Sequence, residues 1–491
     1  MQKKHPRQSK MPEPREKSGQ LKECAPVRPN HYSIIDTHAH LTFPEFEKDQ
    51  KEVIARALES GLEYIVTIGA GEGLAGNQKA IALAEEYDRI YATVGVHPHD
   101  VDAMEDSWLT EIEQMARHPK VVAIGEIGLD FYRSKSSREV QEKRFRQLLK
   151  LARDVDHPIV IHSREACDEI WKILLEDGIP ERGGVFHCFS CSVEFAHKIT
   201  GAGFKISIPG VVTFKNAIEL QEVVAEIPLE KIVLETDCPF LAPEPYRGHR
   251  NEPAYIGHIV EMIADIKQLS FGDVARITSL AAKRLFDLPG SELMPQIAYQ
   301  IRNSIYLNIT NRCTLGCIFC PKYTDYEVKG YYLRLPREPN VEEIFQAIGL
   351  PENYDEVVFC GYGEPTRRLE VLKVIATRMK KQGAKRVRLN TDGLANLIYG
   401  RNIAEEFKGL IDAVSISLNA PDAKTYARIC PSVYGEKAYG EVINFVKECK
   451  RYIPEVTVTA VGLPDFPIDD VARVATELGV PLRIREYMNV G

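Results

Sequence analysis

Three cysteines stand in one short stretch, Cys313-Thr-Leu-Gly-Cys317-Ile-Phe-Cys320, shortly after the apolar, strand-like segment Ile305-Tyr-Leu-Asn-Ile-Thr310. A structural zinc site takes four ligands, and no further Cys or His lies close by in the sequence. Three thiolates suit a cubane of four irons instead, because one iron then lacks a protein ligand and takes a small molecule. The preceding strand would put this loop at the mouth of an α/β barrel or sheet, where such enzymes keep their chemistry.

This CxxxCxxC run, with the aromatic Phe319 before its last cysteine, resembles the signature of the radical S-adenosylmethionine (SAM) enzymes. The resemblance implies a [4Fe-4S] cluster held by Cys313, Cys317 and Cys320. It further implies that the open iron binds the amino and carboxylate groups of SAM, and that one electron cleaves SAM to a 5′-deoxyadenosyl radical. The resemblance covers residues 301–491 and leaves the first three-fifths of the chain unexplained.

The pattern around this loop predicts an open (β/α)6 partial barrel, as in the short radical SAM enzymes. Six strand-like runs alternate with helical stretches, at 305–310, 356–360, 386–390, 413–418, 455–461 and 481–486. Gly361-Tyr-Gly-Glu-Pro-Thr366 resembles the Gly-Gly-Glu motif of the family with Tyr362 inserted, so Gly363 and Glu364 would hold the methionine amino group.

Two further strand ends carry hydroxyls and amides where a ribose and a carboxylate would lie, although such residues are also common turn formers. These candidates for SAM contacts are Thr391, Ser417 and Asn419. The other cysteines of this half, Cys360, Cys430 and Cys449, lie far apart in the sequence. We therefore expect a single cluster, reduced by an external donor such as flavodoxin or ferredoxin.

The first part of the chain repeats a short β-branched run followed by a longer amphipathic stretch. Eight such runs occur, at 33–35, 64–68, 90–96, 121–124, 159–161, 185–186, 204–208 and 231–234. This number and spacing of βα units predicts a (β/α)8 TIM barrel.

Polar side chains follow the carboxyl ends of these strands, where a barrel keeps its active site. His38 and His40 are two residues apart, so both point to the same side of an extended backbone. The full set of four imidazoles and two carboxylates is His38, His40, Glu126, His162, His187 and Asp237. It is too large for one zinc ion and suits two divalent cations that share a carboxylate.

The motifs that carry these residues resemble those of the TatD-type metal-dependent hydrolases, in the amidohydrolase-like barrels. They are Asp36-Thr-His-Ala-His40, Gly95-Val-His-Pro-His-Asp100, Gly125-Glu-Ile-Gly-Leu-Asp130, His162-Ser-Arg-Glu165, His187-Cys-Phe-Ser190 and Glu235-Thr-Asp-Cys-Pro-Phe-Leu-Ala-Pro243. The resemblance implies one metal on His38, His40 and Asp237, a second on His162 and His187, and Glu126 as the bridge. The ions would be Zn, Mn or Mg, and several family members are deoxyribonucleases.

Three further residues are candidates for contacts with an anionic substrate. Arg247 and Arg250 lie in the polar loop Tyr246-Arg-Gly-His-Arg-Asn-Glu-Pro253, which is alternatively a solvated basic loop. His97 follows strand three and is assigned to the substrate because six ligands already complete two sites. Asp237 is the candidate base that accepts the proton of the attacking water, or it is only a ligand.

One departure from the TatD pattern is Cys191, which stands where the family generally has glycine. It makes Cys188-Phe-Ser-Cys191 a CxxC pair that suits redox chemistry or a soft metal. The simpler interpretation, which we favour, is that Cys188 is packed in the barrel and Cys191 is a neutral replacement. Eleven cysteines in 491 residues are too few and too scattered for a disulfide framework.

Composition indicates a soluble, globular protein, and the length of 491 residues favours two domains. The expected iron-sulfur cluster indicates a cytoplasmic setting. A net charge of −8 argues against coating nucleic acid through sheer basicity, and no apolar run is long enough to cross a membrane. We expect a disordered basic tail at 1–30, the hydrolase barrel at 31–287, a linker at 288–300 and the radical SAM partial barrel at 301–491.

These observations predict a fusion of two enzymes, with nucleic acid or a nucleotide as the simplest shared substrate class. In one alternative, the barrel hydrolyses a small amide or ester made by the radical SAM domain. In another, the cluster is a redox sensor that gates the nuclease and performs no radical chemistry.

Overall fold

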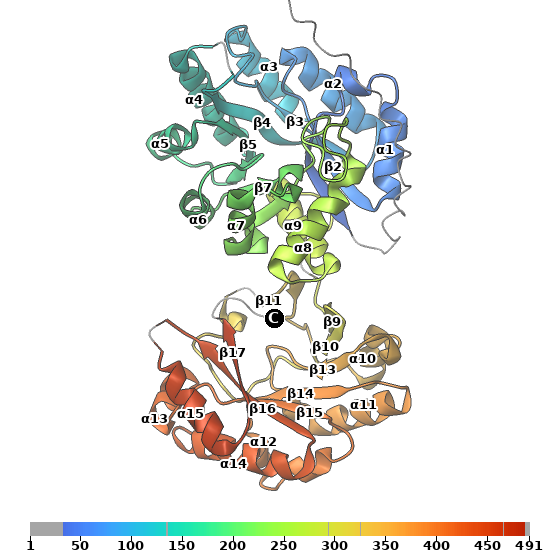
Figure 1. The fold of residues 1–491 in the computed structure, drawn as a ribbon, viewed down its shortest axis with the longest axis vertical. Helices are drawn as coiled ribbons and strands as arrows, with labels where there is room; N and C mark the ends of the chain where they lie inside the picture. The colour runs from blue at the N-terminus through green and yellow to red at the C-terminus, as the bar shows by residue number, and fades with distance from the viewer. Residues whose placement is uncertain (1–32, 134–135, 293, 325, 465, 487–491) are drawn as a thin grey trace, which may run out of the picture.

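The computed structural model describes residues 33–133, 136–292, 294–324, 326–464 and 466–486. The predicted basic tail at 1–30 lies outside the described residues. Figure 1 shows two bodies, a barrel at the top of the view and a curled sheet with its helices below it. Each body has its own apolar core.

The first body is the predicted eight-stranded parallel barrel, with its strands paired in sequence order. The strands are β1 Ile34–Ala39, β2 Leu62–Ile68, β3 Ile90–Val94, β4 Val121–Asp130, β5 Ile159–Arg164, β6 Gly184–Phe186, β7 Lys205–Ile208 and β8 Ile232–Leu234. A parallel bridge between Ala39 and Cys238 joins the last strand end to the first. All eight predicted strands are confirmed to within a few residues.

Amphipathic helices surround the barrel and bury one apolar stripe each. On α1, for example, Val53, Ile54 and Ala57 are buried while the intervening charged residues face solvent. The helices are α1 Gln50–Glu59, α2 Gly73–Glu86, α3 Ser107–Ala116, α4 Arg138–Asp154, α5 Cys167–Asp177, α6 Val193–Gly201, α7 Ile218–Glu226, α8 Ile256–Lys267 and α9 Phe271–Phe286.

Helix α9 closes the amino end of the barrel. Its residues Leu285 and Phe286 form one apolar cluster with strand residues such as Ile35, Val160 and Val233. Ser270 caps the start of this helix by accepting a hydrogen bond from the Asp273 N–H at 3.1 Å. Access to the barrel interior therefore lies at the carboxyl ends of the strands.

The second body is a seven-stranded sheet in the order β17-β16-β15-β14-β13-β10-β9. Its strands are β9 Ala298–Ile301, β10 Ser304–Leu307, β13 Glu356–Phe359, β14 Val387–Thr391, β15 Ala413–Ser417, β16 Glu455–Gly462 and β17 Leu482–Glu486. The six predicted strands are parallel neighbours and form the expected partial barrel. Strand β9 is antiparallel and starts within the stretch predicted as a linker.

Helices α10 Val341–Ile348, α11 Leu369–Lys381, α12 Ala395–Tyr399, α13 Ala423–Ile429, α14 Lys437–Tyr452 and α15 Ile468–Leu478 cover this sheet. A short hairpin, β11 Glu327–Val328 with β12 Tyr331–Tyr332, projects toward the first body.

The hairpin lies beside α9 of the barrel (Figure 1), and just after β9 the Arg302 N–H donates to Asp273 Oδ2 of α9 at 3.1 Å. Arg284 of α9 forms a bidentate ion pair with Glu327, with N···O distances of 2.9 and 2.6 Å. Arg276 donates to the carbonyl of Lys329 and lies 3.9 Å from the ring centroid of Tyr331. A cavity of about 540 Å³ lies beside these contacts, and its lining holds none of the predicted metal or cluster ligands. Among the described residues, no helix combines the length and apolar character needed to cross a bilayer.

Candidate metal centre and cysteine loop

The pairing of two strands shifts register at two of the predicted ligands, His38 and Glu126, which lie inside the barrel mouth. The pairing of β1 with β2 shifts between Asp36 and Ala39, the segment that contains His38. The pairing of β4 with β5 shifts between Gly125 and Ile127, so Glu126 is the extra residue of a bulge. The sequence predicted Glu126 beyond the end of strand four, whereas the strand continues to Asp130.

Glycines let β4 and β5 approach closely at the same point. A Cβ atom on Gly125 would lie 2.5 Å from the Val160 side chain, and one on Gly128 would lie 2.1 Å from the carbonyl oxygen of His162. Gly128 also has a φ of +145°, which side chains other than hydrogen rarely allow. These two glycines therefore bring Glu126 and His162 within contact distance.

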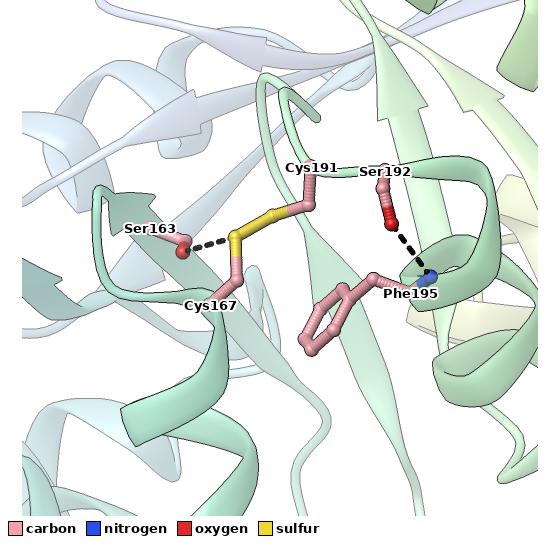
Figure 2. Close-up of a disulfide and its surroundings, with 5 residues drawn as sticks. All are labelled: Ser163, Cys167, Cys191, Ser192 and Phe195. Carbon is pink, nitrogen blue, oxygen red and sulfur yellow. Dashed lines mark hydrogen bonds between the residues drawn. A yellow bond between two sulfur atoms is a disulfide. The ribbon is translucent and has the colours of Figure 1, made fainter.

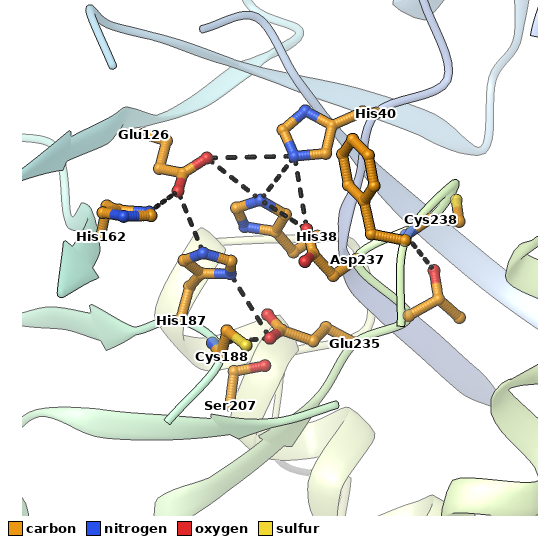
Figure 3. A network of polar contacts seen from close by, with 12 residues as sticks. His38, His40, Glu126, His162, His187, Cys188, Ser207, Glu235, Asp237 and Cys238 are labelled. Atoms are coloured by element: carbon orange, nitrogen blue, oxygen red, sulfur yellow. Dashed lines mark hydrogen bonds and ion pairs between the residues drawn. The ribbon is translucent and has the colours of Figure 1, made fainter. Parts of the chain in front are cut away.

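Four predicted ligands converge at the first half of the site (Figure 3). The Nε2 atoms of His38 and His40 lie 3.3 Å apart. Glu126 Oε2 lies 3.4 Å from His38 Nε2, and Asp237 Oδ1 lies 3.4 Å from His40 Nε2. Donor atoms at these separations surround a point that one divalent cation can occupy.

The other oxygen of Glu126 faces a second group of imidazoles. Its Oε1 atom lies 2.6 Å from His162 Nδ1 and 3.0 Å from His187 Nε2. The two oxygens of one carboxylate thus face the two halves of the predicted ligand set. All six predicted metal ligands lie in this one pocket, and they are buried or half-buried.

Two further carboxylates lie beside the outer nitrogens of the second group of imidazoles. Asp130 Oδ2 lies 3.2 Å from His162 Nε2 and 2.9 Å from His99 Nε2. Glu235 Oε1 lies 3.4 Å from His187 Nδ1. An imidazole whose outer nitrogen donates to a carboxylate presents its inner nitrogen as a ligand. Both Asp130 and Glu235 belong to the motifs identified in the sequence, but the sequence alone did not predict their role beside the imidazoles.

The electrostatics of the pocket favour ionised carboxylates beside imidazoles. Burial works to raise the pKa of Glu126, but the surrounding imidazoles, His187 first among them, outweigh it and hold this pKa well below its usual value. Burial likewise opposes ionisation of Asp237, and the hydrogen bond from His40 with the nearby imidazoles lowers its pKa overall. Burial lowers the pKa of His38.

His97, predicted as a substrate contact, also lies in this pocket. Its Nε2 atom is 3.6 Å from Glu126 Oε1, and its Nδ1 atom accepts a hydrogen bond from the His99 N–H at 3.1 Å. Burial lowers the pKa of His97 to about 3, so the ring is neutral and carries its proton on Nε2. Its inward nitrogen is therefore a hydrogen-bond donor.

The two arginines of the polar loop have protein partners. Arg250 forms a bidentate ion pair with Asp49, at 2.7 and 2.6 Å, so its guanidinium is already engaged. Arg247 is about half exposed and stacks 4.1 Å from the ring centroid of Phe214. Arg247 is thus the better placed of the two for a substrate anion.

A disulfide joins Cys167 to Cys191 (Figure 2), which corrects the interpretation of Cys191 as a neutral replacement. The link connects the start of α5, just after the His162 strand, to the loop that follows His187. Ser163 Oγ contacts the Cys167 sulfur at 3.4 Å. Cys188 remains a free thiol, and burial raises its pKa, so the CxxC pair predicted as an alternative does not form.

The three-cysteine loop lies in the second body, which also holds buried polar groups without protein partners. Cys313, Cys317 and Cys320 are all free and partly buried. Asn419 Oδ1, Tyr426 Oη and Asn390 Oδ1 are buried polar atoms without a hydrogen-bond partner. Three free thiols in one loop of a domain with such unpartnered polar atoms fit a cluster that binds a further polar molecule.

The predicted SAM contacts are largely committed to protein partners. Glu364 accepts hydrogen bonds from Thr366, from Thr391 Oγ1 at 2.9 Å and from the Asp392 N–H at 2.6 Å. A Cβ atom on Gly363 would lie 2.0 Å from the Thr310 carbonyl oxygen, so this glycine permits a close backbone contact. Asn419 donates through Nδ2 to the Cys430 sulfur. The roles of Gly363, Glu364, Thr391, Ser417 and Asn419 as SAM contacts stay predictions.

Comparison with known families agrees with both folds. The model of the TatD related DNase family matches residues 35–287, and the chain belongs to this family. Residues 307–478 match the radical SAM superfamily, so the hydrolase is fused to a radical SAM domain.

Similar proteins match the first half of the chain. The uncharacterized metal-dependent hydrolase YabD of Bacillus subtilis (strain 168) is 44% identical over 253 residues, which are 52% of this chain and 98% of YabD. The 3′-5′ ssDNA/RNA exonuclease TatD of Shigella flexneri serotype 5b (strain 8401) is 36% identical over 52% of this chain and 99% of its own. The crystal structure of YjjV, a TatD homologue from Escherichia coli K12, shares 32% identity with a TM-score of 0.49, over 52% of this chain and 98% of YjjV.

Proposed function

We propose that the first domain hydrolyses phosphodiester bonds with two divalent cations, Zn, Mn or Mg, which Glu126 would bridge. The observation that carries this proposal is the position of Glu126, with Oε2 3.4 Å from His38 and Oε1 3.0 Å from His187. His38, His40 and Asp237 would hold one cation, and His162 and His187 the other. A bound pair of cations lowers the pKa of a water and neutralises charge on the leaving group.

The side chains around the pair have separate roles in this proposal. Asp237 accepts the proton of the attacking water, because its lowered pKa keeps the carboxylate ionised. Asp130 and Glu235 fix the orientation of His162 and His187. His97 donates from Nε2 to a substrate oxygen, and Arg247 meets the phosphate chain further out.

Single-stranded DNA is the substrate class that we favour. The Shigella relative, 36% identical over the hydrolase half, is named a 3′-5′ ssDNA/RNA exonuclease. The competing candidate is a small amide or ester, which the same pair of cations would also activate.

The test uses the full chain, prepared anaerobically and loaded with Mn²⁺ or Zn²⁺. It is incubated with single-stranded DNA, single-stranded RNA, an aryl phosphodiester and an aryl ester. Cleavage of nucleic acid that is lost in Glu126→Gln supports the proposal. Turnover of the ester alone, with neither nucleic acid cleaved, would replace it with the small-molecule hydrolase.

We propose further that the second domain cleaves SAM at a [4Fe-4S] cluster held by Cys313, Cys317 and Cys320. When bound, the cluster would supply one electron to the sulfonium of SAM, and Gly363, Glu364 and the other predicted contacts would orient SAM. An electron donor such as flavodoxin or ferredoxin is required, because the described part of the chain offers no second group of cysteines.

Anaerobic incubation with dithionite and SAM tests this second activity. Release of 5′-deoxyadenosine that disappears in Cys317→Ala supports radical chemistry. A cluster that is reduced without releasing 5′-deoxyadenosine would favour the alternative in which it senses redox state and gates the nuclease.

A further inference from the structure

Two aromatic side chains stand exposed at the mouth of the barrel, on opposite sides of it. Tyr132 is 58% exposed and Phe240 is 46% exposed. Tyr132 follows β4 and Phe240 follows β8, and the strand order of the eight-stranded barrel places these two strand ends across the mouth from each other. The exposed aliphatic residues Leu175 and Ile218, in contrast, lie on the outer helices α5 and α7. In the described part of the barrel, the exposed rings are therefore confined to the face that holds the predicted metal ligands.

Phe240 lies beside the first group of predicted ligands. Its ring centroid is 6.1 Å from that of His40 and 6.2 Å from that of Phe43, which itself stacks on His40 at 4.4 Å. The backbone of Phe240 is fixed, because its N–H donates to the Asp237 carbonyl at 2.9 Å and its carbonyl accepts from Asn251 Nδ2 at 2.6 Å. An exposed ring is thus anchored next to a predicted metal ligand.

Tyr132 lies beside the second group of predicted ligands. Its N–H donates to Asp130 Oδ1 at 2.9 Å, and the other oxygen of this carboxylate contacts His162. The guanidinium of Arg164, which ends β5, lies 5.3 Å from the Tyr132 ring centroid. Arg164 is exposed, and no carboxylate among the described residues pairs with it. This side of the mouth therefore offers an aromatic ring together with a positive charge.

The two sides together match what a nucleic-acid strand presents. Aromatic rings bind unpaired bases by stacking, and a guanidinium binds phosphate. Glu126 and the imidazoles stand between the two rings, so a strand that spans the mouth passes over them. In a duplex the base faces are already stacked on one another and cannot meet the rings. A small ester is too short to reach both sides.

We propose that Phe240 and Tyr132 are specificity-determining residues that stack on unpaired bases on either side of the scissile phosphate and so select single-stranded DNA. This inference rests on the proposed hydrolysis of phosphodiesters and deepens it. Arg164 binds a phosphate of the strand beside Tyr132. The selection lies in the two rings, because the cation pair alone would activate an ester as well as a phosphodiester.

The test uses the full chain, prepared anaerobically and loaded with Mn²⁺, and two single-stranded DNA oligonucleotides of equal length. One carries ordinary bases, and the other carries abasic residues in place of its 3′-terminal nucleotides. We expect Phe240→Ala and Tyr132→Ala each to lower kcat/KM on the ordinary strand about 5- to 150-fold, the value of one base–aromatic stack, chiefly by raising KM. On the abasic strand both variants should match the wild type.

Matched variants separate stacking from bulk. Phe240→Trp and Tyr132→Phe keep a ring and should retain most of the wild-type kcat/KM. Phe240→Leu keeps an apolar side chain without a ring face, so it should resemble Phe240→Ala, and it serves where the alanine variant folds poorly. Leu175→Ala removes an exposed apolar side chain far from the mouth and should leave both substrates unaffected.

A binding measurement checks the stack without catalysis. The Glu126→Gln protein is mixed with a strand that contains 2-aminopurine, a base whose fluorescence is quenched when it stacks. We expect quenching on binding that is lost when Phe240→Ala is added to Glu126→Gln.

Three results would overturn the inference. The first is an equal kcat/KM on the ordinary strand in the wild type and in both alanine variants. The second is an equal loss on the ordinary and abasic strands, because the rings would then only shape the mouth. The third is cleavage of duplex DNA as fast as the single strand. A wild type that turns over an aryl ester but no nucleic acid would instead refute the proposed function.

Discussion

The Nε2 atom of His162 lies 3.2 Å from Oδ2 of Asp130, while its Nδ1 atom faces Glu126. Asp130 is itself held rigidly, since its Oδ1 atom accepts from the backbone N–H groups of Tyr132 and Arg133 at 2.9 and 2.7 Å. An acid fixed in this way sets both the orientation of the imidazole and the nitrogen that carries its proton.

Replacement of Asp130 by Ala should therefore weaken metal binding about 10- to 100-fold without removing a direct ligand. The measurement is metal affinity by calorimetry, together with the rise in Tm on adding Mn²⁺ or Zn²⁺. Asp130→Asn is the matched control, because its amide oxygen still accepts from His162 and it should lose less affinity. Equal losses in the two variants would argue against an orienting role.

Replacement of His162 by Ala should abolish hydrolysis and leave the release of 5′-deoxyadenosine unchanged. The reason is spatial, because His162 lies at the open end of the barrel, whereas the second domain contacts α9 at the closed end. Both assays are run on one anaerobic preparation of the full chain. A parallel fall of both activities would contradict the division into two sites.

Removal of the disulfide by Cys191→Ser should destabilise the hydrolase domain by about 3 kcal/mol, the loop-closure value for a short loop. The two half-cystines are 24 residues apart. Thermal unfolding of the full chain, followed with and without dithiothreitol, provides the measurement. Cys167→Ser should match Cys191→Ser, and the reductant should affect neither variant, whereas a further drop would point to another labile site.

Lys205 predicts a rise of stability in alkaline solution. Burial, with the charges of Lys231 and Arg284, lowers its pKa to about 8 from 10.5. Below pH 8 the ammonium is charged in both states and the folded protein carries the burial cost. Between pH 8 and 10.5 the unfolded state binds more protons, so the free energy of unfolding rises with pH, by at most ~3 kcal/mol.

Lys205→Met removes this group and tests the assignment. The variant should be more stable than wild type at pH 7, and the difference should shrink as the pH approaches 10.5. Denaturant unfolding at several pH values measures it. A difference between the two proteins that does not vary with pH would show that Lys205 titrates normally.

Much of the architecture could be predicted from local sequence patterns. The alternation of β-branched runs with amphipathic stretches gave all eight barrel strands and six strands of the second sheet, because these patterns report which face of each element is buried. The spacing of His38 and His40 alone predicted that both side chains point to the same side of the strand. Strand β9 was not predicted from the sequence, because it is short and antiparallel and the turn-rich stretch before it resembles a linker.

The remaining features depend on contacts between distant segments. The bulge at Glu126 arises from the pairing of β4 with β5, which a single strand cannot reveal. Cys167 and Cys191 sit on different βα units, and Tyr132 and Phe240 lie across the mouth from each other only in the assembled barrel. The sequence shows the Gly-rich motif that contains Asp130. It does not show that the Asp130 side chain contacts His162, because that contact depends on how β4 pairs with β5.

Helix α9 closes the barrel at the end where the second domain contacts it, and Phe286 belongs to the apolar cluster at this end. A molecule released beside Glu126 leaves from the opposite pole and must diffuse around the outside of the protein to arrive at the cysteines. The fusion thus provides equal copy number of the two domains and a raised local concentration of one site near the other, which tethering alone supplies.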